Sequence, residues 1–186
     1  MYVQKAGLIE NVEYFDNGKF SISGSEAKMI DPKQRISLEC SYEALQYPES
    51  LSEFQSTGVY VGCLSNDFDN IVADKDLTSA FASTGMCNSI ISNRVSYALG
   101  FTGPSMTIDT ACSASLVAMD AACSAIRKND CDQAVVLGVN LLLSPVLFVA
   151  FCSSKMLSPN GRCATFSDQA DGYVRSEGLL YCLSTI

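Results

Sequence analysis

The pattern of apolar and polar positions predicts helices and strands that alternate along the chain. Short runs rich in β-branched residues predict strands at Gly58–Leu64, Ser105–Asp109 and Ala134–Leu143. Amphipathic or capped segments predict helices at Asp31–Gln46, Asn88–Leu99, Ala114–Asn129 and Val146–Cys152. The acidic stretch Ser65–Lys75 is expected to form an exposed loop.

Residues that start and stop helices set several of these boundaries. Asp31 followed by Pro32 is typical of a helix start, with the carboxylate as the N-cap and proline at the first helical position. Tyr47-Pro48 is expected to end that helix, and Gly100 is expected at the C′ position of the next one. The predicted apolar side of the first helix consists of Ile36, Leu38, Cys40, Ala44 and Leu45.

The segment after Ser105 has the pattern of a βαβ unit. The strand Ser105–Asp109 is followed by a turn, then by a helix in which apolar residues recur at steps of three, four and three. We expect these residues to form its one buried face: Leu116, Met119, Cys123 and Ile126. A βαβ unit predicts an α/β fold with a parallel or mixed sheet covered by helices.

The charge-free segment Gln133–Ser154 is long enough to span a bilayer. Gly138, Asn140 and Ser144-Pro145 interrupt it, which favours a buried strand, a turn and a helix, with a membrane span as the alternative. No N-terminal signal peptide is apparent.

Composition narrows the function classes. The chain has 186 residues, 48% hydrophobic and 17% charged, which predicts one folded domain spanning residues 1–186. A net charge of -8 argues against a nucleic-acid partner. The nine cysteines include no Cys-x-x-Cys pair, so we expect no metal site, and free thiols predict a reducing, cytoplasmic compartment, with an organelle as the alternative. The sequence contains no histidine, the usual general base.

Cys112 is the candidate catalytic residue. It lies where the strand Ser105–Asp109 ends and the next helix begins, and backbone N–H groups at a helix N-terminus stabilise a thiolate and the oxyanion of a tetrahedral intermediate. The spacing alone leaves an inert buried thiol as the commoner alternative. Asp109 precedes it by three residues, and we expect a turn or capping role for this aspartate.

The residues around Cys112 are similar to the active-site segment of β-ketoacyl synthases, in particular the ketosynthase domains of type I polyketide synthases. The similar motifs run in order through the chain: Asp31-Pro32-Lys33-Gln34-Arg35, Asn93-Arg94-Val95-Ser96-Tyr97, Asp109-Thr110-Ala111-Cys112-Ser113, Gly138-Val139-Asn140, Met156-Leu157-Ser158-Pro159-Asn160-Gly161 and Ala170-Asp171-Gly172-Tyr173-Val174-Arg175-Ser176-Glu177-Gly178. Ala114, Lys33 and Ser167 depart from the family pattern, which usually has serine, glutamine and aspartate there.

The resemblance implies a thiolase-like mixed sheet in α-β-α layers, of which this chain is the incomplete N-terminal half. It also implies acyltransferase chemistry: Cys112 accepts an acyl chain from the phosphopantetheine of an acyl carrier protein, and a decarboxylated malonyl-type extender then attacks that acyl group. No cofactor is expected to bind to the chain itself. The family's histidines belong to the other half of the domain, so we expect the isolated chain to be inactive in condensation.

Further expectations concern partners and alternatives. The resemblance implies a homodimer joined through the strand at 105–109, and the absent half of the domain is a further expected partner. Arg162, Asp171, Arg175 and Glu177 could contact the phosphopantetheine arm, although ion pairing or turn formation is the favoured interpretation. The alternative functions are a fatty-acid synthase ketosynthase and a non-catalytic dimerising module.

Overall fold

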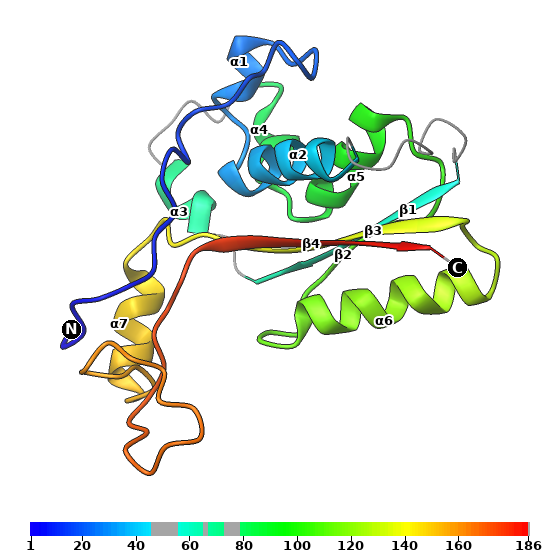
Figure 1. Cartoon of the computed structure of the whole chain (residues 1–186). Coiled ribbons are helices and arrows are strands. Elements are labelled where there is room, and N and C mark those ends of the chain that lie inside the picture. Colours follow the sequence, from blue (N-terminus) through cyan, green and yellow to red (C-terminus); the bar gives the residue numbers. More distant parts are fainter. Residues whose placement is uncertain (46–55, 65–66, 73–78, 186) are drawn as a thin grey trace.

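The computed structural model describes residues 1–45, 56–64, 67–72 and 79–185. Within them the chain forms a central sheet with helices on both faces (Figure 1). The helices on one face are α1 (Gly24–Ala27), α2 (Pro32–Leu45), α4 (Ala82–Met86) and α5 (Ser89–Leu99). The opposite face carries α6 (Ala114–Arg127), while α3 (Asp67–Val72) and α7 (Val146–Ser153) lie toward one end of the sheet. The expected α-β-α layering is confirmed.

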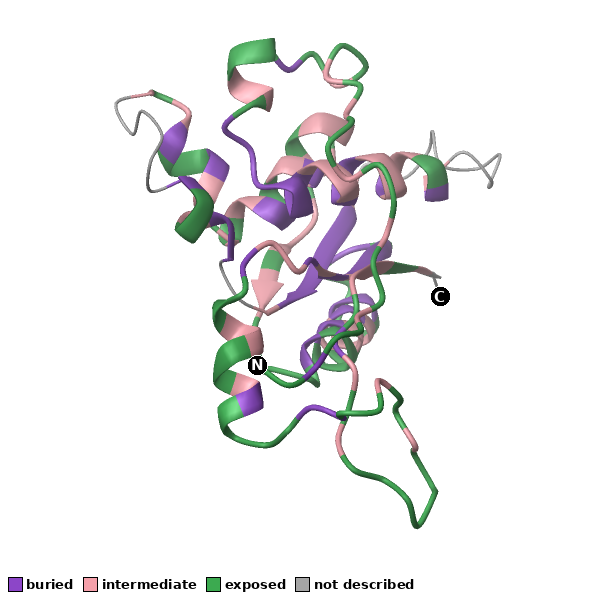
Figure 2. Ribbon diagram, turned by 90° about the vertical axis from the view of Figure 1, so that its left-hand side faces the viewer, coloured by how far each residue is buried: buried purple, intermediate pink, exposed green. Residues whose placement is uncertain are grey.

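The described strands form a four-stranded mixed sheet in the order β2-β1-β3-β4. β1 (Thr57–Cys63) pairs in parallel with both β2 (Ser105–Ile108) and β3 (Gln133–Asn140), and β4 (Gly178–Thr185) runs antiparallel to β3. The connection β2-α6-β3 is therefore the predicted βαβ unit, with β1 inserted between its two strands. β1 and β3 lie inside the sheet and are buried along most of their length (Figure 2).

Successive residues of β1 face opposite layers of the core. Val59 and Val61 pack with Leu38 of α2 and Ile91 of α5, whereas Tyr60 packs with the alanines of α6. Gly100 ends α5 with φ of 73°, so the predicted glycine cap is confirmed. The predicted stop at Tyr47-Pro48 lies outside the described residues.

The expected buried face of α6 is wrong. The helix buries its alanine side, and Leu116 is 70% exposed. Met119 and Cys123 are only partly buried, and Ile126 alone of the four expected residues is buried. The residues that face the sheet are Ala114, Ala118, Ala122, Ala125 and Ile126. Small side chains bring the helix axis close to the sheet, and the larger side chains are left on the outer face.

α2 also differs from its predicted pattern. Its start is confirmed, because the Asp31 carboxylate accepts a hydrogen bond from the Lys33 backbone N–H at 2.8 Å. Its buried side, however, is mixed. Of the expected apolar residues only Leu38 and Ala44 are buried, and they are joined by Pro32 and by the polar residues Lys33, Gln34, Ser37 and Ser41. Among these polar groups, the Gln34 side-chain amide donates to the backbone carbonyls of Thr84 and Gly85, whereas the hydroxyls of Ser37 and Ser41 have no hydrogen-bond partner among the described residues.

The predicted loop at Ser65–Lys75 is wrong where the structure describes it. Residues 67–72 form the helix α3, whose Phe68 and Val72 are buried with Met29 and Ala82. The other residues of the predicted loop lie outside the described part. Of the segment Gln133–Ser154, the strand β3 and the helix α7 are as predicted. Among the described helices, none has the length and apolar character needed to cross a membrane.

Candidate active site

Cys112 lies in the turn between β2 and α6, as predicted. It is exposed, and it precedes Ser113, the N-cap residue of α6. The turn is tight: Ala111 has φ of 55°, in the left-handed region, and its backbone N–H donates to the Asp109 carboxylate at 2.9 Å. The turn role expected for Asp109 is therefore present. The thiol lies at the end of the helix where the first backbone N–H groups lack intrahelical carbonyl partners.

Two glycines hold the start of α6 against the sheet, a role that the sequence analysis did not assign to either of them. Gly62 of β1 and Gly138 of β3 are paired in register, at the level where α6 begins. A Cβ at Gly62 would lie 2.4 Å from the Ser115 backbone nitrogen, and one at Gly138 would lie 2.9 Å from the Ser115 Cβ. Only glycine leaves room for this approach. Each glycine interrupts a β-branched run, which is the sequence signal of close backbone contact.

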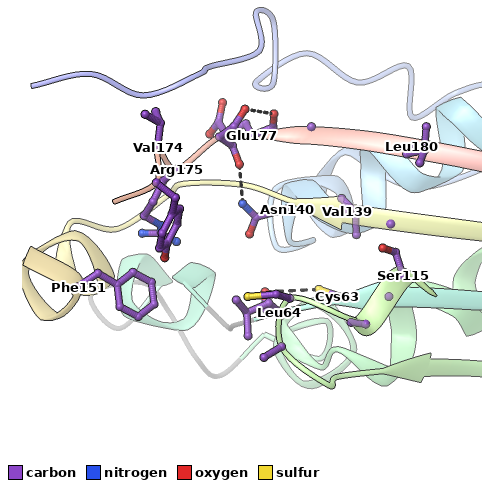
Figure 3. A pocket seen from close by; sticks show the side chains of 18 of the residues that line it. Cys63, Leu64, Ser115, Val139, Asn140, Phe151, Val174, Arg175, Glu177 and Leu180 are labelled. Atoms are coloured by element: carbon purple, nitrogen blue, oxygen red, sulfur yellow. Dashed lines mark hydrogen bonds between the residues drawn. The ribbon is translucent and has the colours of Figure 1, made fainter. Parts of the chain in front are cut away.

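A cavity of about 560 Å³ opens beside Cys112. Its walls come from the ends of β1 and β3, the turn at 111–115, α7 and the segment at 173–178. Figure 3 shows Arg175 and Phe151 on one side of this pocket and Ser115 and Leu180 on the other. Cys63 also lines it, but burial raises the pKa of its thiol, and its Sγ lies 3.7 Å from the Leu64 carbonyl oxygen. Of these two cysteines, Cys112 is therefore the better nucleophile candidate.

Arg175 reaches this cavity in an unusual setting. Only 6% of the residue is exposed, and its guanidinium carbon lies 4.7 Å from the ring centre of Phe148 and 5.3 Å from that of Phe151. Among the described residues, its NH1 group has no hydrogen-bond partner. Burial lowers the pKa of Arg175, while the carboxylate of Asp67 opposes that shift. Contact of Arg175 with the phosphopantetheine arm is the less favoured interpretation of the sequence, and the structure places this residue on the wall of the pocket.

The other three candidate residues of the segment 161–178 are Glu177, Asp171 and Arg162, and the first two accept hydrogen bonds from other parts of the chain. Both carboxylate oxygens of Glu177 accept from backbone N–H groups, one from Ile9 at 3.0 Å and one from Leu142 at 2.9 Å. Asp171 accepts from the Asn160 side chain at 2.7 Å, and hydrogen bonds with Ser158 and Asn160 lower its pKa. Arg162 is exposed. Within the described residues none of these side chains makes an ion pair, so the expected ion pairing is wrong, whereas turns are present at residues 159–160 and 165–166.

The remaining cysteines are free thiols in varied surroundings. Cys131 and Cys152 are buried, like Cys63, whereas Cys87 and Cys163 are exposed. Cys40 has its pKa raised to about 11, mainly by burial. The pKa of Cys87 is lowered, chiefly by hydrogen bonds with Ser89. Cys87 does not line the cavity beside Cys112.

The model of the β-ketoacyl synthase N-terminal domain matches residues 1–183. The chain belongs to the β-ketoacyl synthase family. It is 44% identical over 185 residues to a highly reducing polyketide synthase of Penicillium polonicum, covering 95% of this chain and 7% of that protein. It is also 44% identical over 176 residues to a non-reducing polyketide synthase of Penicillium canescens, covering 92% of this chain and 7% of that protein. The chain thus spans only a small part of the length of these relatives.

Solved ketosynthase structures share the fold. The oxazolomycin ketosynthase domain of Streptomyces albus matches with a TM-score of 0.89 and 36% identity, over 97% of this chain and 33% of the solved one. The ketosynthase from module 6 of the bacillaene synthase of Bacillus subtilis matches with a TM-score of 0.85 and 34% identity, over 96% of this chain and 31% of the solved one. The chain therefore has the thiolase-like fold of polyketide ketosynthase domains and spans about a third of those solved chains.

Proposed function

We propose that the chain carries the nucleophile of a polyketide β-ketoacyl synthase and that Cys112 is that nucleophile. The observation that carries this proposal is the position of Cys112: an exposed thiol in a strained turn, directly before the α6 N-cap, on the wall of a cavity of about 560 Å³. A turn that presents a nucleophile at a helix N-terminus supplies the two requirements of acyl transfer, an activated sulfur and oxyanion donors.

The first step is transthioesterification. The Cys112 sulfur attacks the thioester carbonyl of an acyl group carried on the phosphopantetheine of an acyl carrier protein. A carbon–sulfur bond to Cys112 forms, the bond to the carrier thiol breaks, and the proton of the Cys112 thiol ends on the released carrier thiol. The backbone N–H of Cys112 is one candidate donor to the oxyanion. No cofactor bound by the chain takes part in this step.

Condensation needs more than this nucleophile. A malonyl-type extender must lose carbon dioxide, and the enolate that results must be stabilised by hydrogen-bond donors while it attacks the acyl group. The chain has no histidine for that role. We therefore propose that these residues carry the acyl-transfer half of the reaction and that further residues of the family's domain complete the condensation.

Intact-mass spectrometry tests the acyl-transfer step. Incubation of the full chain with an acyl thioester should add one acyl mass, and peptide mapping should place it on Cys112. The variant Cys112→Ala should show no acylation, whereas Cys163→Ala, which removes another exposed thiol, should be acylated like the wild type. Acylation that persists in Cys112→Ala would contradict the assignment. Release of carbon dioxide from malonyl carrier protein by the full chain would refute the limit to acyl transfer.

Two alternatives remain distinguishable. A fatty-acid ketosynthase would use the same nucleophile, and product analysis with acyl and malonyl carrier proteins separates the two. The polyketide relatives at 44% identity favour the polyketide assignment. A non-catalytic module would keep its binding properties in Cys112→Ala and would show no acylation in the wild type.

We also propose that two copies of the chain associate. β2 is an edge strand, and the edge that faces away from β1 has no strand beside it within the described residues. Such an edge can pair with the same strand of a second copy, so we propose a homodimer through residues 105–109. Sedimentation equilibrium tests this, and a monomer at concentrations far above those of the assay would contradict it.

The outer face of α6 and β4 points to a second contact. Leu116 and Leu180 are exposed there by 70% and 71%, and both line one small pocket between α6 and β4. Contiguous apolar surface of this kind usually lies at an interface. We propose that residues 1–186 form one part of a larger domain whose further segment covers this face. The nine free thiols are consistent with a reducing, cytoplasmic setting.

A further inference from the structure

The cavity beside Cys112 contains a phenol that the acyl-transfer step does not use. Tyr173 lines this cavity, and 37% of the residue is exposed. Its hydroxyl makes no hydrogen bond with any described residue. The hydroxyl of Tyr2, in contrast, donates to the backbone carbonyl of Leu157 at 2.8 Å. The Tyr173 hydroxyl is therefore free to form a hydrogen bond with a ligand in the cavity.

The surroundings of Tyr173 hold it in place. Its backbone N–H donates to the Met156 carbonyl at 3.1 Å, and its carbonyl accepts from the Ser158 N–H at 2.9 Å. The preceding Gly172 has φ of 139°, and a Cβ there would lie 2.5 Å from the Ser158 nitrogen, so the two segments are in close contact. The Tyr173 ring centre lies 6.4 Å from that of Phe151. A donor that is fixed in this way loses little freedom when a ligand binds.

The phenol lies near the proposed nucleophile. Burial raises the pKa of Tyr173, the Arg175 guanidinium opposes this rise, and the negative charge of a Cys112 thiolate adds to it. Because the interaction between two charges weakens with distance, the effect of Cys112 indicates that its sulfur and the phenol are neighbours. The raised pKa keeps the proton on Tyr173 at neutral pH, so the phenol acts as an uncharged donor.

The rest of this wall indicates which ligand group the phenol meets. Phe151, Met156 and Val174 line the cavity together with Tyr173. A single polar group on an otherwise apolar wall determines where an oxygen of the ligand lies. The proposed condensation leaves a keto oxygen on carbon 3 of its product, and a second condensation places that oxygen on carbon 5. Acyl groups made by this chemistry therefore carry oxygens close to the thioester.

We propose that Tyr173 is a specificity residue whose hydroxyl forms a hydrogen bond with a keto or hydroxyl oxygen of the acyl group on Cys112. This inference rests on the proposed function, because the acyl group is the one that Cys112 accepts. A saturated chain would displace the water that solvates the phenol and would offer no acceptor in return. The cavity therefore favours acyl chains that bear such an oxygen over saturated chains of the same length.

The experiment compares second-order rate constants for acylation of Cys112 in the full chain, measured by intact-mass spectrometry. The probes are N-acetylcysteamine thioesters of hexanoate and of hexanoates with a keto or hydroxyl group at carbon 3 or carbon 5. Each rate constant is divided by that of the saturated thioester in the same variant. Because every probe carries the same N-acetylcysteamine group, a contact of Tyr173 with that group cancels in the ratio. Comparison of the ratios between variants also removes the intrinsic reactivity of each probe.

The variant Tyr173→Phe removes the hydroxyl and keeps the ring. Tyr97→Phe is the matched control, since Tyr97 is 92% exposed on α5 and does not line the cavity. For at least one oxygenated probe, we expect the wild-type ratio to exceed the Tyr173→Phe ratio about threefold to tenfold, the size of one hydrogen bond between neutral groups. Tyr97→Phe should keep the wild-type ratio. Tyr173→Phe should also keep the wild-type Tm, because its hydroxyl has no partner among the described residues.

Equal ratios in the wild type and Tyr173→Phe for every probe would overturn the inference and leave the proposed function standing. A Tyr173→Phe variant that does not fold, or whose Tm falls by about 2 °C or more, would show that the hydroxyl bonds within the protein, which also overturns the inference. Absence of acylation by every thioester in the wild type would overturn the proposed function, and the inference with it.

Discussion

The contact between Gly62 and the start of α6 predicts that one methyl group displaces Cys112, the proposed nucleophile. In Gly62→Ala, the new Cβ would lie 2.4 Å from the Ser115 nitrogen, 2.5 Å from the Ser115 Cα and 2.6 Å from the Ala114 carbonyl carbon. All three are backbone atoms, so no side chain can rotate away. Ordinary contact begins at 3.4 Å, and 3.4 minus 2.4 gives a required displacement of about 1 Å.

This displacement has two expected costs. Overpacking of a close-packed interior destabilises by about 1 to 3 kcal/mol, and for a domain of this size each kcal/mol lowers Tm by roughly 2 to 4 °C. Misplacement of a reacting group by about 1 Å can lower its rate by about 100-fold. Because Cys112 lies two residues before the first residue of α6, it must move when the start of that helix moves.

Two other glycines, Gly138 and Gly178, provide comparisons in which the added methyl group meets less crowding than at Gly62. At Gly138 the nearest atom is the Ser115 Cβ at 2.9 Å, so Gly138→Ala requires a smaller shift and should have an intermediate effect. At Gly178 of β4 nothing lies within 4 Å, so Gly178→Ala should have little effect on stability. The assay is the rate of Cys112 acylation by a thioester, together with Tm from circular dichroism. If Gly62→Ala had the rate and Tm of the wild type, the packing argument would be refuted.

Two further predictions concern α6 and the pH dependence of stability. Leu116→Ala should change the free energy of unfolding by less than about 0.5 kcal/mol, because Leu116 is 70% exposed. Ala118→Leu, at a residue that is 0% exposed, should lower the free energy of unfolding by about 1 to 3 kcal/mol, measured by urea denaturation. A larger loss of stability in Leu116→Ala than in Ala118→Leu would contradict the observed helix face. Burial raises the pKa of Tyr60 from 10.0 to about 12. The folded state then holds this proton while the unfolded state loses it, so stability should fall as pH rises from 10.0 to about 12. Tyr60→Phe should lose less stability in that range, and a Tyr60 that titrates like free tyrosine in ultraviolet absorbance would refute this.

Local signals were sufficient for the elements around Cys112. The Asp31 cap, the glycine stop at Gly100 and the turn after β2 depend on residues adjacent in sequence, and each is present in the structure. The family resemblance gave the layered fold, which the solved ketosynthases share at TM-scores of 0.85 and 0.89. Local structure can thus be predicted from the sequence where the interacting residues are close along the chain.

The buried face of α6 could not be predicted from hydrophobic periodicity. That reasoning places the largest apolar residues inside, but here the facing strands carry Gly62 and Gly138, and the helix packs too closely for leucine. Ala118 and Ala122 are both 0% exposed as a result. The helix is rich in alanine, but the meaning of this composition depends on the glycines of β1 and β3, which are distant in sequence.

The buried polar residues of α2 could not be predicted from the sequence for a related reason. Gln34 is 0% exposed because its side-chain amide donates to the carbonyls of Thr84 and Gly85 and its carbonyl accepts from Arg94. Those partners lie 50 to 60 residues further along the chain. The periodicity of α2 cannot reveal these partners. A prediction from the pattern alone therefore places Gln34 on the solvent side, although it is buried.

The difference between contacts that are local and contacts that are distant in sequence also applies to the site: the reactivity proposed for Cys112 depends on the first kind and the shape of its cavity on the second. The surroundings of Cys112 come from the turn at residues 109–113, so its chemistry follows from adjacent residues. The far wall of its cavity comes from the segment at 173–178, which is anchored by Glu177 to the backbone of Ile9 and Leu142. Under the proposed function, a substitution in that segment can therefore change which acyl groups fit the cavity without changing the turn that contains Cys112. In the proposed function, reactivity and selectivity therefore depend on different parts of the chain, and only the residues around Cys112 form a continuous motif.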